Sequence, residues 1–351
     1  MTDDKTIWVY AIKTHCVKIG DNQIIKNLDE IEKLAGELKL ETKHHESSSR
    51  ELSLYEQEGI NYCIYGSSNY PKAFYELSSP PSIIYYFGDL SKISYKESIS
   101  IVGTRNASSY GLQVTEAIIS KLAQYHVNII SGLARGIDLA GHQAALDHNL
   151  KTTAILGSGL KSFSYGGSQR AMFKQLKSNP ENLIISEFAP MQPAESWTFS
   201  HRNRLIAALS PTTIVVEASL NSGSLITASY AQELKRQILT VPADIFKESF
   251  AGCHQLLENN SAQGIYNLDS LEEFLNLKTK KNYQPNTKLN FEIDLSSKQN
   301  AILKCLSKEG TGLDTISIQT DYPTNELLAD LSTLELCGLI TKLKGEKYIK
   351  N

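Results

Sequence analysis

Six short apolar segments, each followed or preceded by a helix-like segment, occupy residues 98–241 and constrain the fold more than any other feature. Strands that are apolar on both faces and alternate with helices are typical of a parallel sheet that helices cover on both sides. The sequence therefore predicts an α/β fold. The predicted strands are Ser98–Val102, Val127–Ile130, Thr152–Leu156, Leu183–Ser186, Thr212–Glu217 and Gln237–Val241.

Helices are predicted between these strands. Ser108 or Ser109 is expected to cap a helix that buries apolar side chains at helical spacing up to Leu122. Further helices are predicted over Ile137–His148 and Leu225–Leu234.

Residues 1–60 carry weaker patterns, from which we expect a small N-terminal helical region. Ile24–Leu40 has apolar residues at helical spacing, which predicts a helix, whereas the polar segment Glu41–Glu51 predicts a loop. Asn61–Leu90 mixes β-like runs with prolines and predicts an extended segment that packs on the sheet. The main domain is expected to span residues 61–277.

A second domain is expected over residues 291–351, after a polar linker at residues 278–290. Three short helices followed by a hairpin that turns near Gly345 are typical of a winged helix. Gly338 is expected to cap the last of these helices. The predicted helices are Ser297–Leu306, Leu313–Thr320 and Thr324–Cys337.

Composition and charge limit the ligands and the cellular compartment that we expect for this chain. The 351 residues are 41% hydrophobic, and the formal net charge of −3 means that any polyanion site must be a local patch. The five cysteines are scattered without zinc-ligand spacing, which is typical of a reduced compartment. We see neither a signal peptide nor a membrane-spanning stretch, so we expect a cytoplasmic protein with no membrane partner.

Glycine turns follow several predicted strands, and each carries a hydroxyl or a guanidinium group. Ligands of open α/β sheets bind beyond the carboxyl ends of the strands, where backbone amides and helix N-termini attract anions. The sequence therefore predicts one anion site at this edge. Its candidate residues are Gly103, Thr104 and Arg105 in the first turn, Ser131, Gly132, Arg135 and Gly136 in the second, and Ser222, Gly223 and Ser224 in a later one.

The segment Phe199–Arg204 adds groups suited to a nucleic acid. Arg202 and Arg204 carry forked cations that match phosphate, and Asn203 can bond a base edge or the backbone. Phe199 offers a face for base stacking or, alternatively, packs at the start of a helix. The alternative for the arginines is a solvated or ion-paired position at the surface.

Enzymatic and cofactor motifs are missing. The run Gly157–Ser162 begins like a dinucleotide-binding motif but lacks its third glycine, and it is not a P-loop. His142 is expected to pack or hydrogen-bond within the fold. Asp138 is expected either to be stabilised by the helix dipole or to bond a neighbouring amide. We expect no cofactor, no metal and no catalytic residue.

These motifs together resemble the DNA-processing protein A family (DprA, also called Smf). The resemblance runs from about Asn61 to Asn267, and the C-terminal winged helix resembles that of the same family. It is carried by four blocks, which are Val102–Arg105 with Ser109–Gly111, Ser131–Asp138 with His142, Phe199–Ala207, and Val216–Ala218 with Ser222–Ala228.

The resemblance implies a Rossmann-like domain and a bacterial cytoplasmic protein that binds single-stranded DNA during natural transformation. Such proteins protect incoming strands, load the RecA recombinase on them and usually act as homodimers; they are not enzymes. The family's DNA pocket corresponds to Arg105, Phe199, Arg202 and Arg204 in this sequence.

Two other hypotheses stay open. A related Rossmann-like group cleaves nucleoside monophosphates, but its catalytic glutamate has no counterpart in Ser222–Ser229. A duplex-DNA regulator would act through the winged helix, whose predicted recognition helix carries Glu326, Asp330 and Glu335 and no basic residue. Phosphates would repel such a helix.

Overall fold

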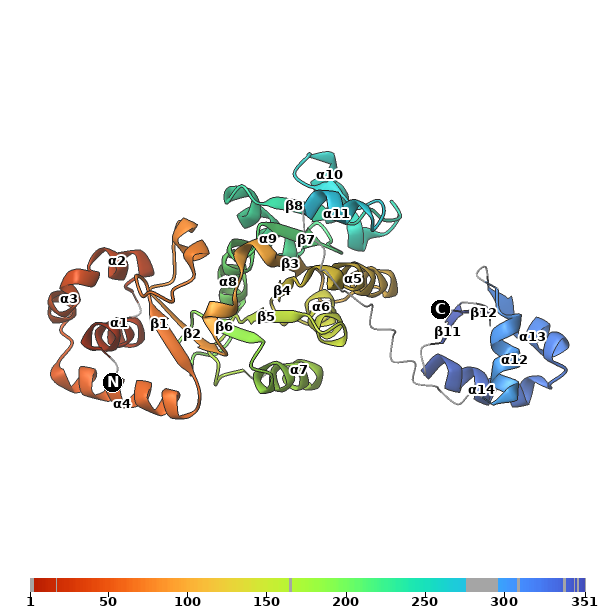
Figure 1. Ribbon diagram of the computed structural model, residues 1–351, viewed down its shortest axis with the longest axis horizontal. Coiled ribbons are helices and arrows are strands. Elements are labelled where there is room, and N and C mark those ends of the chain that lie inside the picture. The colour runs from red at the N-terminus through yellow and green to blue at the C-terminus, as the bar shows by residue number, and fades with distance from the viewer. Residues whose placement is uncertain are drawn as a thin grey trace. The chain divides into compact units, whose positions relative to one another are not determined.

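The computed structural model describes residues 3–16, 18–163, 166–275, 296–307, 310–336, 339–343, 345 and 347–350. The chain divides into two compact units, Met1–Pro285 and Asn286–Asn351 (Figure 1). The linker predicted at residues 278–290 and the cap predicted at Gly338 lie outside the described residues.

A nine-stranded sheet in the order β1-β2-β6-β5-β4-β3-β7-β8-β9 forms the centre of the first unit (Figure 1). The neighbouring strands β6, β5, β4, β3, β7, β8 and β9 run parallel to one another. Beside β6, the strands β2 and β1 extend the sheet with antiparallel pairing. The parallel sheet is confirmed, and the six predicted strands end within two residues of the observed ones. The strands are β1 Asn61–Ile64, β2 Ile83–Phe87, β3 Ser98–Val102, β4 Asn128–Ser131, β5 Lys151–Ile155, β6 Leu183–Ser186, β7 Thr212–Val215, β8 Gln237–Thr240 and β9 Gln263–Gly264.

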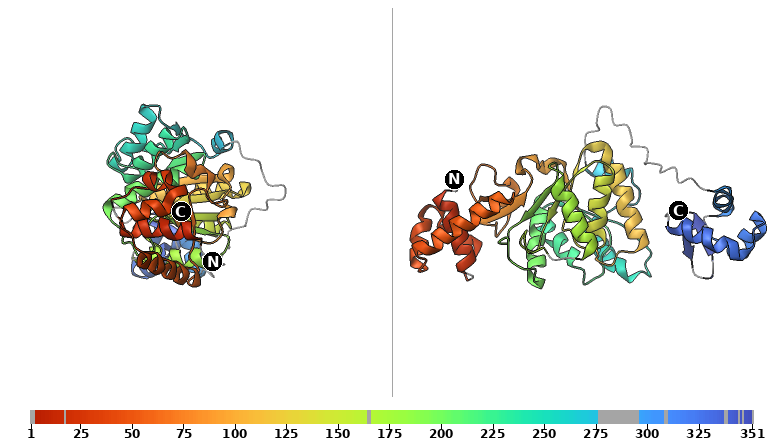
Figure 2. Two further views of the ribbon diagram at one scale, coloured as in Figure 1. Left: turned by 90° about the vertical axis from the view of Figure 1, so that its left-hand side faces the viewer. Right: turned by 90° about the horizontal axis from the view of Figure 1, so that it is seen from below.

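Helices cover both faces of this sheet (Figure 2). Side chains alternate along a strand, so Ile99 and Ile101 of β3 pack with α5 and α6, while Val102 packs on the opposite face with α8 and α9. Ser108 caps α5 as predicted, because its hydroxyl accepts a hydrogen bond from the amide of Gly111. The helices are α5 Ser109–Leu122, α6 Ile137–Asp147, α7 Gly167–Ser178, α8 Ser196–Ala208, α9 Gly223–Glu233, α10 Ala251–Glu258 and α11 Ser270–Leu275.

Four helices precede the sheet and correct two predictions. The loop predicted at Glu41–Glu51 is wrong, because α4 starts at Thr42 and continues to Gln57. Its buried face consists of only Ser48, Leu52 and Tyr55, which is too few apolar residues to stand out in a polar sequence. The single helix predicted over Ile24–Leu40 is also wrong, since a 3-10 turn interrupts it. The helices are α1 Asp4–His15, α2 Asp21–Lys26, α3 Ile31–Glu37 and α4 Thr42–Gln57.

The second unit is a winged helix, as predicted. Its helices pack around a small core that includes Ile302, Ile316 and Leu331. The hairpin turns through Gly345, whose φ of 82° is a left-handed conformation that favours glycine. The elements are α12 Ser297–Cys305, β10 Thr311–Gly312, α13 Leu313–Thr320, α14 Thr324–Leu336, β11 Ile340–Leu343 and β12 Lys347–Lys350. In the described ranges of both units, no helix combines the length and apolar character that crossing a bilayer requires.

Candidate nucleic-acid interface

The order of the strands reverses between β3 and β7. From β3 the chain proceeds through β4, β5 and β6 on one side and returns to place β7, β8 and β9 on the other. Ligands of open α/β sheets bind at such a switch point, beyond the carboxyl ends of the strands. Here the turns meet: the amide of Thr104 donates to the carbonyl of Glu217 at 2.7 Å, and the amide of Ile137 donates to the carbonyl of Thr104 at 3.2 Å.

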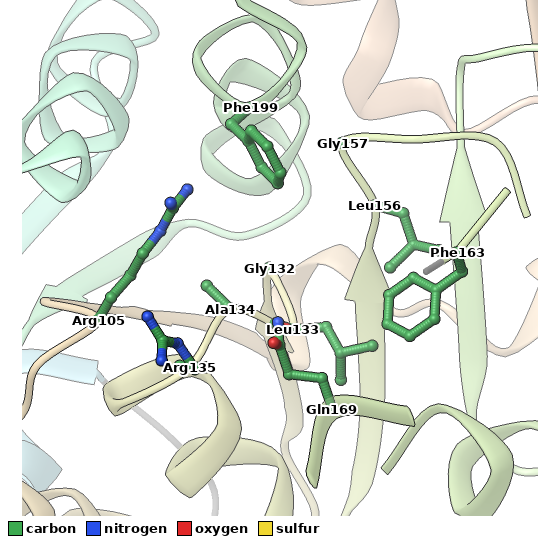
Figure 3. Close-up of a pocket in the computed structure, with 10 residues that line it drawn as sticks. All are labelled: Arg105, Gly132, Leu133, Ala134, Arg135, Leu156, Gly157, Phe163, Gln169 and Phe199. Carbon is green, nitrogen blue, oxygen red and sulfur yellow. Dashed lines mark hydrogen bonds between the residues drawn. The ribbon is translucent and has the colours of Figure 1, made fainter. Parts of the chain in front are cut away.

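Two adjoining cavities open at this point. The switch-point cavity has about 420 Å³ and lies between the turns after β3 and β7 and helix α8. The β4–β5 cavity has about 210 Å³ and lies beside it (Figure 3). Arg105, Ala134 and Phe199 line both cavities. Of the predicted site residues, the structure places in these walls Gly103, Thr104, Arg105, Gly132, Arg135, Phe199, Arg202, Asn203, Ser222, Gly223 and Ser224.

Arg105 and Arg135 are the two exposed cations of the cavity walls. The guanidinium carbon of Arg105 lies 4.9 Å from the centre of the Phe199 ring, a distance at which a cation and a ring attract each other. Figure 3 shows Arg135 beside Arg105, on the neighbouring turn and across the cavity from Phe199. Neither arginine forms an ion pair with a described residue. Two positive charges therefore face the cavities without an ion-pairing carboxylate from the described residues, and the one carboxylate in the walls, that of Asp138, is engaged with Gly132.

Arg202 lies at the back of the switch-point cavity and is only 3% exposed. Its guanidinium donates to the carbonyl oxygens of Gly132, at 2.8 Å, and Ile155, and so joins the ends of β4 and β5. The carboxylate of Asp138 accepts from the amide of Gly132 at 3.1 Å, as predicted. Burial raises the pKa of Asp138, and the nearby charge of Arg202 opposes this rise. Arg202 thus organises the cavity wall from within.

Arg204 corrects the prediction of a phosphate-binding or surface arginine. Its side chain is 3% exposed, and two of its nitrogens donate to the carboxylate of Glu187 at 2.8 and 2.6 Å. Burial alone would raise the pKa of Glu187, but the charge of Arg204 and the hydrogen bonds from His201 and Arg204 outweigh it and lower the pKa to about 2. Arg204 lies in neither cavity because α8 turns it toward the end of β6. Its role in the structure is a buried ion pair.

The remaining predicted residues shape the backbone of the site. Adding a Cβ atom at Gly132 would place it 2.5 Å from Arg202 Nη2 and 2.6 Å from Asp138 Oδ2. Gly136 has a φ of 77° and lies against the backbone of Thr104, so it lies behind the cavities and not in their walls.

Serine hydroxyl groups at the site are engaged within the fold. Ser131 is buried and donates to the carbonyl of Ile101 at 2.6 Å, so it lines neither cavity. Ser222 caps α9 and lies 2.7 Å from the hydroxyl of Ser224. Asn203 donates to the carbonyl of Gly223 at 3.0 Å. These contacts hold the turn after β7 against α8.

His142 has the packing role that its sequence context predicts. Its Nδ1 lies 2.6 Å from the hydroxyl oxygen of Thr152, which itself donates to the carbonyl of Ile129 at 2.8 Å. Nδ1 therefore carries the proton and donates it. Burial, reinforced by the charge of Arg202, lowers the pKa of His142 to about 3, so the ring is neutral at physiological pH.

Sequence reasoning missed part of the β4–β5 cavity. Gly157, Phe163 and Gln169 line it, and Gln169 donates to the carbonyl of Leu133 at 2.8 Å. Gly157 lies against the ring of Phe199. The signal in the sequence is the glycine pair at Gly157 and Gly159, which fits neither a dinucleotide motif nor a P-loop and instead follows the carboxyl end of β5.

The fold and the cavities define an α/β protein with an arginine-lined switch point and a separate winged-helix unit. Residues 61–276 match the family described as DNA recombination-mediator protein A, and residues 291–346 match the DprA winged helix domain. The chain therefore belongs to the DprA/Smf family of DNA-processing proteins.

Similar proteins agree with this membership. Protein Smf of Synechocystis is 31% identical over 333 residues, which cover 85% of this chain and 82% of that protein. Protein Smf of Escherichia coli is 31% identical over 80% of this chain and 74% of its own length. The solved structure of DNA processing protein A from Helicobacter pylori has a TM-score of 0.55 at 30% identity and covers 61% of this chain and 95% of that one. That of DprA from Streptococcus pneumoniae, at 24% identity and a TM-score of 0.63, covers 80% of this chain and 100% of that one and supports the fold.

Proposed function

We propose that this chain binds single-stranded DNA in the two cavities at the switch point, without altering it covalently. The observation that carries the proposal is the pair of exposed guanidinium groups, Arg105 and Arg135, which frame the cavity opposite Phe199. The Helicobacter pylori relative is described as binding single-stranded DNA. A guanidinium group forms paired hydrogen bonds with phosphate oxygens, and the Phe199 ring can stack on a base.

The shape of the site favours an unpaired strand. Both cavities are enclosed between turns and helix α8, and their volumes of about 210 and 420 Å³ suit single nucleotides. In a duplex the faces of the bases are stacked on their neighbours and cannot reach Phe199. An unpaired strand can turn its bases into the cavities while its phosphates stay at Arg105 and Arg135.

The carboxylates near the switch point support a binding role over catalysis. Asp138 is buried and engaged with the amide of Gly132. Glu217 is buried and accepts from the amide and the hydroxyl of Ser108, each at 2.9 Å. A nucleotide hydrolase needs a carboxylate that is free to act on the substrate. Glu217 is held by Ser108, and Asp138, although it lines the switch-point cavity, is held by the amide of Gly132 beside the charge of Arg202.

The direct test compares ligands on the full chain. Fluorescence anisotropy should show tight binding of an unpaired oligonucleotide and markedly weaker binding of a duplex with the same sequence. Incubation with a panel of nucleoside monophosphates should release no free base. Equal affinity for both forms of DNA would contradict the proposal, and release of base would support the hydrolase instead.

The proposal extends to two partners. We propose that the chain acts as a homodimer in the cytoplasm, where it protects an incoming strand and loads the RecA recombinase on it, as its membership of the family suggests. Light scattering after gel filtration tests the dimer. A strand-exchange assay on strands covered by single-strand-binding protein tests loading, and absence of stimulation by this chain would contradict that part.

A further inference from the structure

A third hollow adjoins the two cavities and is not needed for the site described above. This hollow, the α5–α6 groove, has about 430 Å³ and is lined mainly by Ala107, Leu112, Leu139 and Ala140. Arg105 also lines it and is therefore shared by all three hollows.

Leu112 of α5 exposes apolar surface in this groove instead of packing in the core. The buried face of α5 consists of Gly111, Thr115, Ile118, Ile119 and Leu122, and Leu112 lies beside that face with 42% of its surface exposed. Exposing a leucine forgoes the stabilisation that its burial would give. The groove thus keeps apolar surface in water directly beside the guanidinium of Arg105, which forms no ion pair with a described residue.

Gly136 joins the groove to the cavities. It caps α6 with a φ of 77°, and a Cβ atom at this position would lie 2.8 Å from the backbone carbon of Arg105. The backbones of the turns after β3 and β4 therefore touch at the floor of the groove. Gly136 and Arg105 both line the groove.

The chemistry of the lining indicates what the groove accommodates. A strand whose phosphate is held by Arg105 and Arg135 must continue beyond them, and its next base needs an apolar surface. The groove offers aliphatic side chains for the face of that base. Its polar lining residues besides Arg105 are the neutral Asn106 and Gln143, so no lining carboxylate repels the backbone.

We propose that the α5–α6 groove receives one unpaired nucleobase, that of the nucleotide next to the one at Phe199. This inference rests on the proposed binding of single-stranded DNA. Because the contacts are aliphatic, the groove accepts any of the four bases. Arg105 then holds the phosphate between two base sites, one at Phe199 and one at Leu112.

The test combines a change in the protein with a change in the DNA. Leu112→Ala removes apolar surface at an exposed position, and Leu54→Ala, at a leucine of α4 that is 55% exposed, is the matched control. The DNA is an oligothymidylate in which a single abasic site is moved along the strand. We expect Leu112→Ala to weaken binding of the intact strand roughly fivefold, within the range that base contacts give, and Leu54→Ala to leave it unchanged.

The abasic series identifies the occupant. In the wild type, an abasic site at one position of the strand should weaken binding, and the same loss of affinity should appear in Phe199→Ala, because the base at that position does not contact Phe199. In Leu112→Ala, an abasic site at this position should cause no further loss of affinity. Ala140→Glu, which places a carboxylate in the groove, should weaken binding of the intact strand still more. Circular dichroism establishes that each variant is folded.

Failure of this inference and failure of the proposed function differ in outcome. If the wild type binds the strand and Arg105→Ala weakens binding, but Leu112→Ala and Ala140→Glu bind like the wild type, the groove holds no base. If these two variants change the mass in light scattering and not the affinity for DNA, the groove is an interface between copies, which also overturns the inference. If the wild type itself does not bind single-stranded DNA, the proposed function fails.

Discussion

Arg105 and Phe199 meet at the switch point, with the guanidinium carbon of one 4.9 Å from the ring centre of the other. Arg105 comes from the turn after β3, and Phe199 from the first turn of α8. Arg202 and Arg204 follow Phe199 on the same helix, yet both are buried. This contrast separates an arginine that can contact a ligand from two whose guanidinium groups are engaged within the fold.

Arg105→Ala should weaken binding of single-stranded DNA roughly tenfold or more, because it removes a charged hydrogen-bond donor from the cavity. The slope of log affinity against log salt should decrease by about 0.7, which corresponds to one phosphate contact. Anisotropy titrations at several salt concentrations measure both effects. Arg170→Ala, at an exposed position of α7, removes the same charge elsewhere and should change neither. Similar losses in both variants would assign the effect to overall charge.

Arg204→Met should act on stability first. It leaves the buried carboxylate of Glu187 without its main partner, and breaking a buried pair in this way costs about 3–5 kcal/mol of unfolding free energy. Replacing both residues, as in Glu187→Leu with Arg204→Met, should restore a large part of the loss. Urea denaturation of the single and double variants measures this. If the single variant is stable but has lost DNA binding, Arg204 contacts the DNA and the assignment to a buried ion pair is wrong.

His142 should make the protein less stable as the pH falls. Its folded pKa of about 3 lies below the ordinary value of 6.5, so between these values the unfolded chain binds a proton that the folded chain does not. The contribution is fully present above pH 6.5 and is lost as the pH falls toward 3, by up to about 1.4 kcal/mol per pH unit.

Denaturation of His142→Gln across that pH range checks the origin of the slope. Glutamine does not titrate, so the variant should show a shallower decline of the unfolding free energy in acid. His15→Gln, at an exposed position of α1, should keep the slope of the wild type. An unchanged slope in His142→Gln would assign the acid sensitivity to other groups, such as Glu187, whose depressed pKa acts at lower pH.

Two glycines of the site should respond differently to alanine. At Gly132 the added methyl group meets Arg202 and Asp138, so Gly132→Ala should destabilise the fold by about 1–3 kcal/mol and weaken DNA binding. At Gly223 no atom lies within 4 Å of the added Cβ, so Gly223→Ala should fold like the wild type. Thermal unfolding and anisotropy measure both variants. Equal stability of the two would mean that the wall at Gly132 is more yielding than the structure indicates.

Removing residues 286–351 should leave single-strand binding intact, because the cavities belong wholly to the first unit. The described residues of α14 include Glu326, Asp330 and Glu335, which disfavour contact with phosphates. Anisotropy with matched single strands and duplexes on the shortened chain tests this. A large loss of affinity for either form would assign DNA contacts to the winged helix.

The sequence predicted the sheet well because its strands are buried on both faces. A short run of buried apolar residues such as Leu183–Ile185 favours a strand, and the glycine turns after such strands mark the carboxyl edge. The N-terminal helix α4 was missed for the opposite reason, since three buried residues among polar neighbours carry little periodic signal. Local pattern predicts an element only where its own burial is extensive.

Sequence alone determined that the glycines, Arg105 and Arg135 belong to turns at one edge of a parallel sheet, because strand direction places successive turns there. Phe199 and the two arginines after it, which the sequence also assigned to a turn, lie on helix α8. Only the tertiary structure decided which arginines face the cavity. Arg204 is buried because Glu187 lies at the end of β6, and Arg202 because the carbonyls of Gly132 and Ile155 end two other strands. These partners come from distant segments, and the energy of a charge depends on which of them surround it.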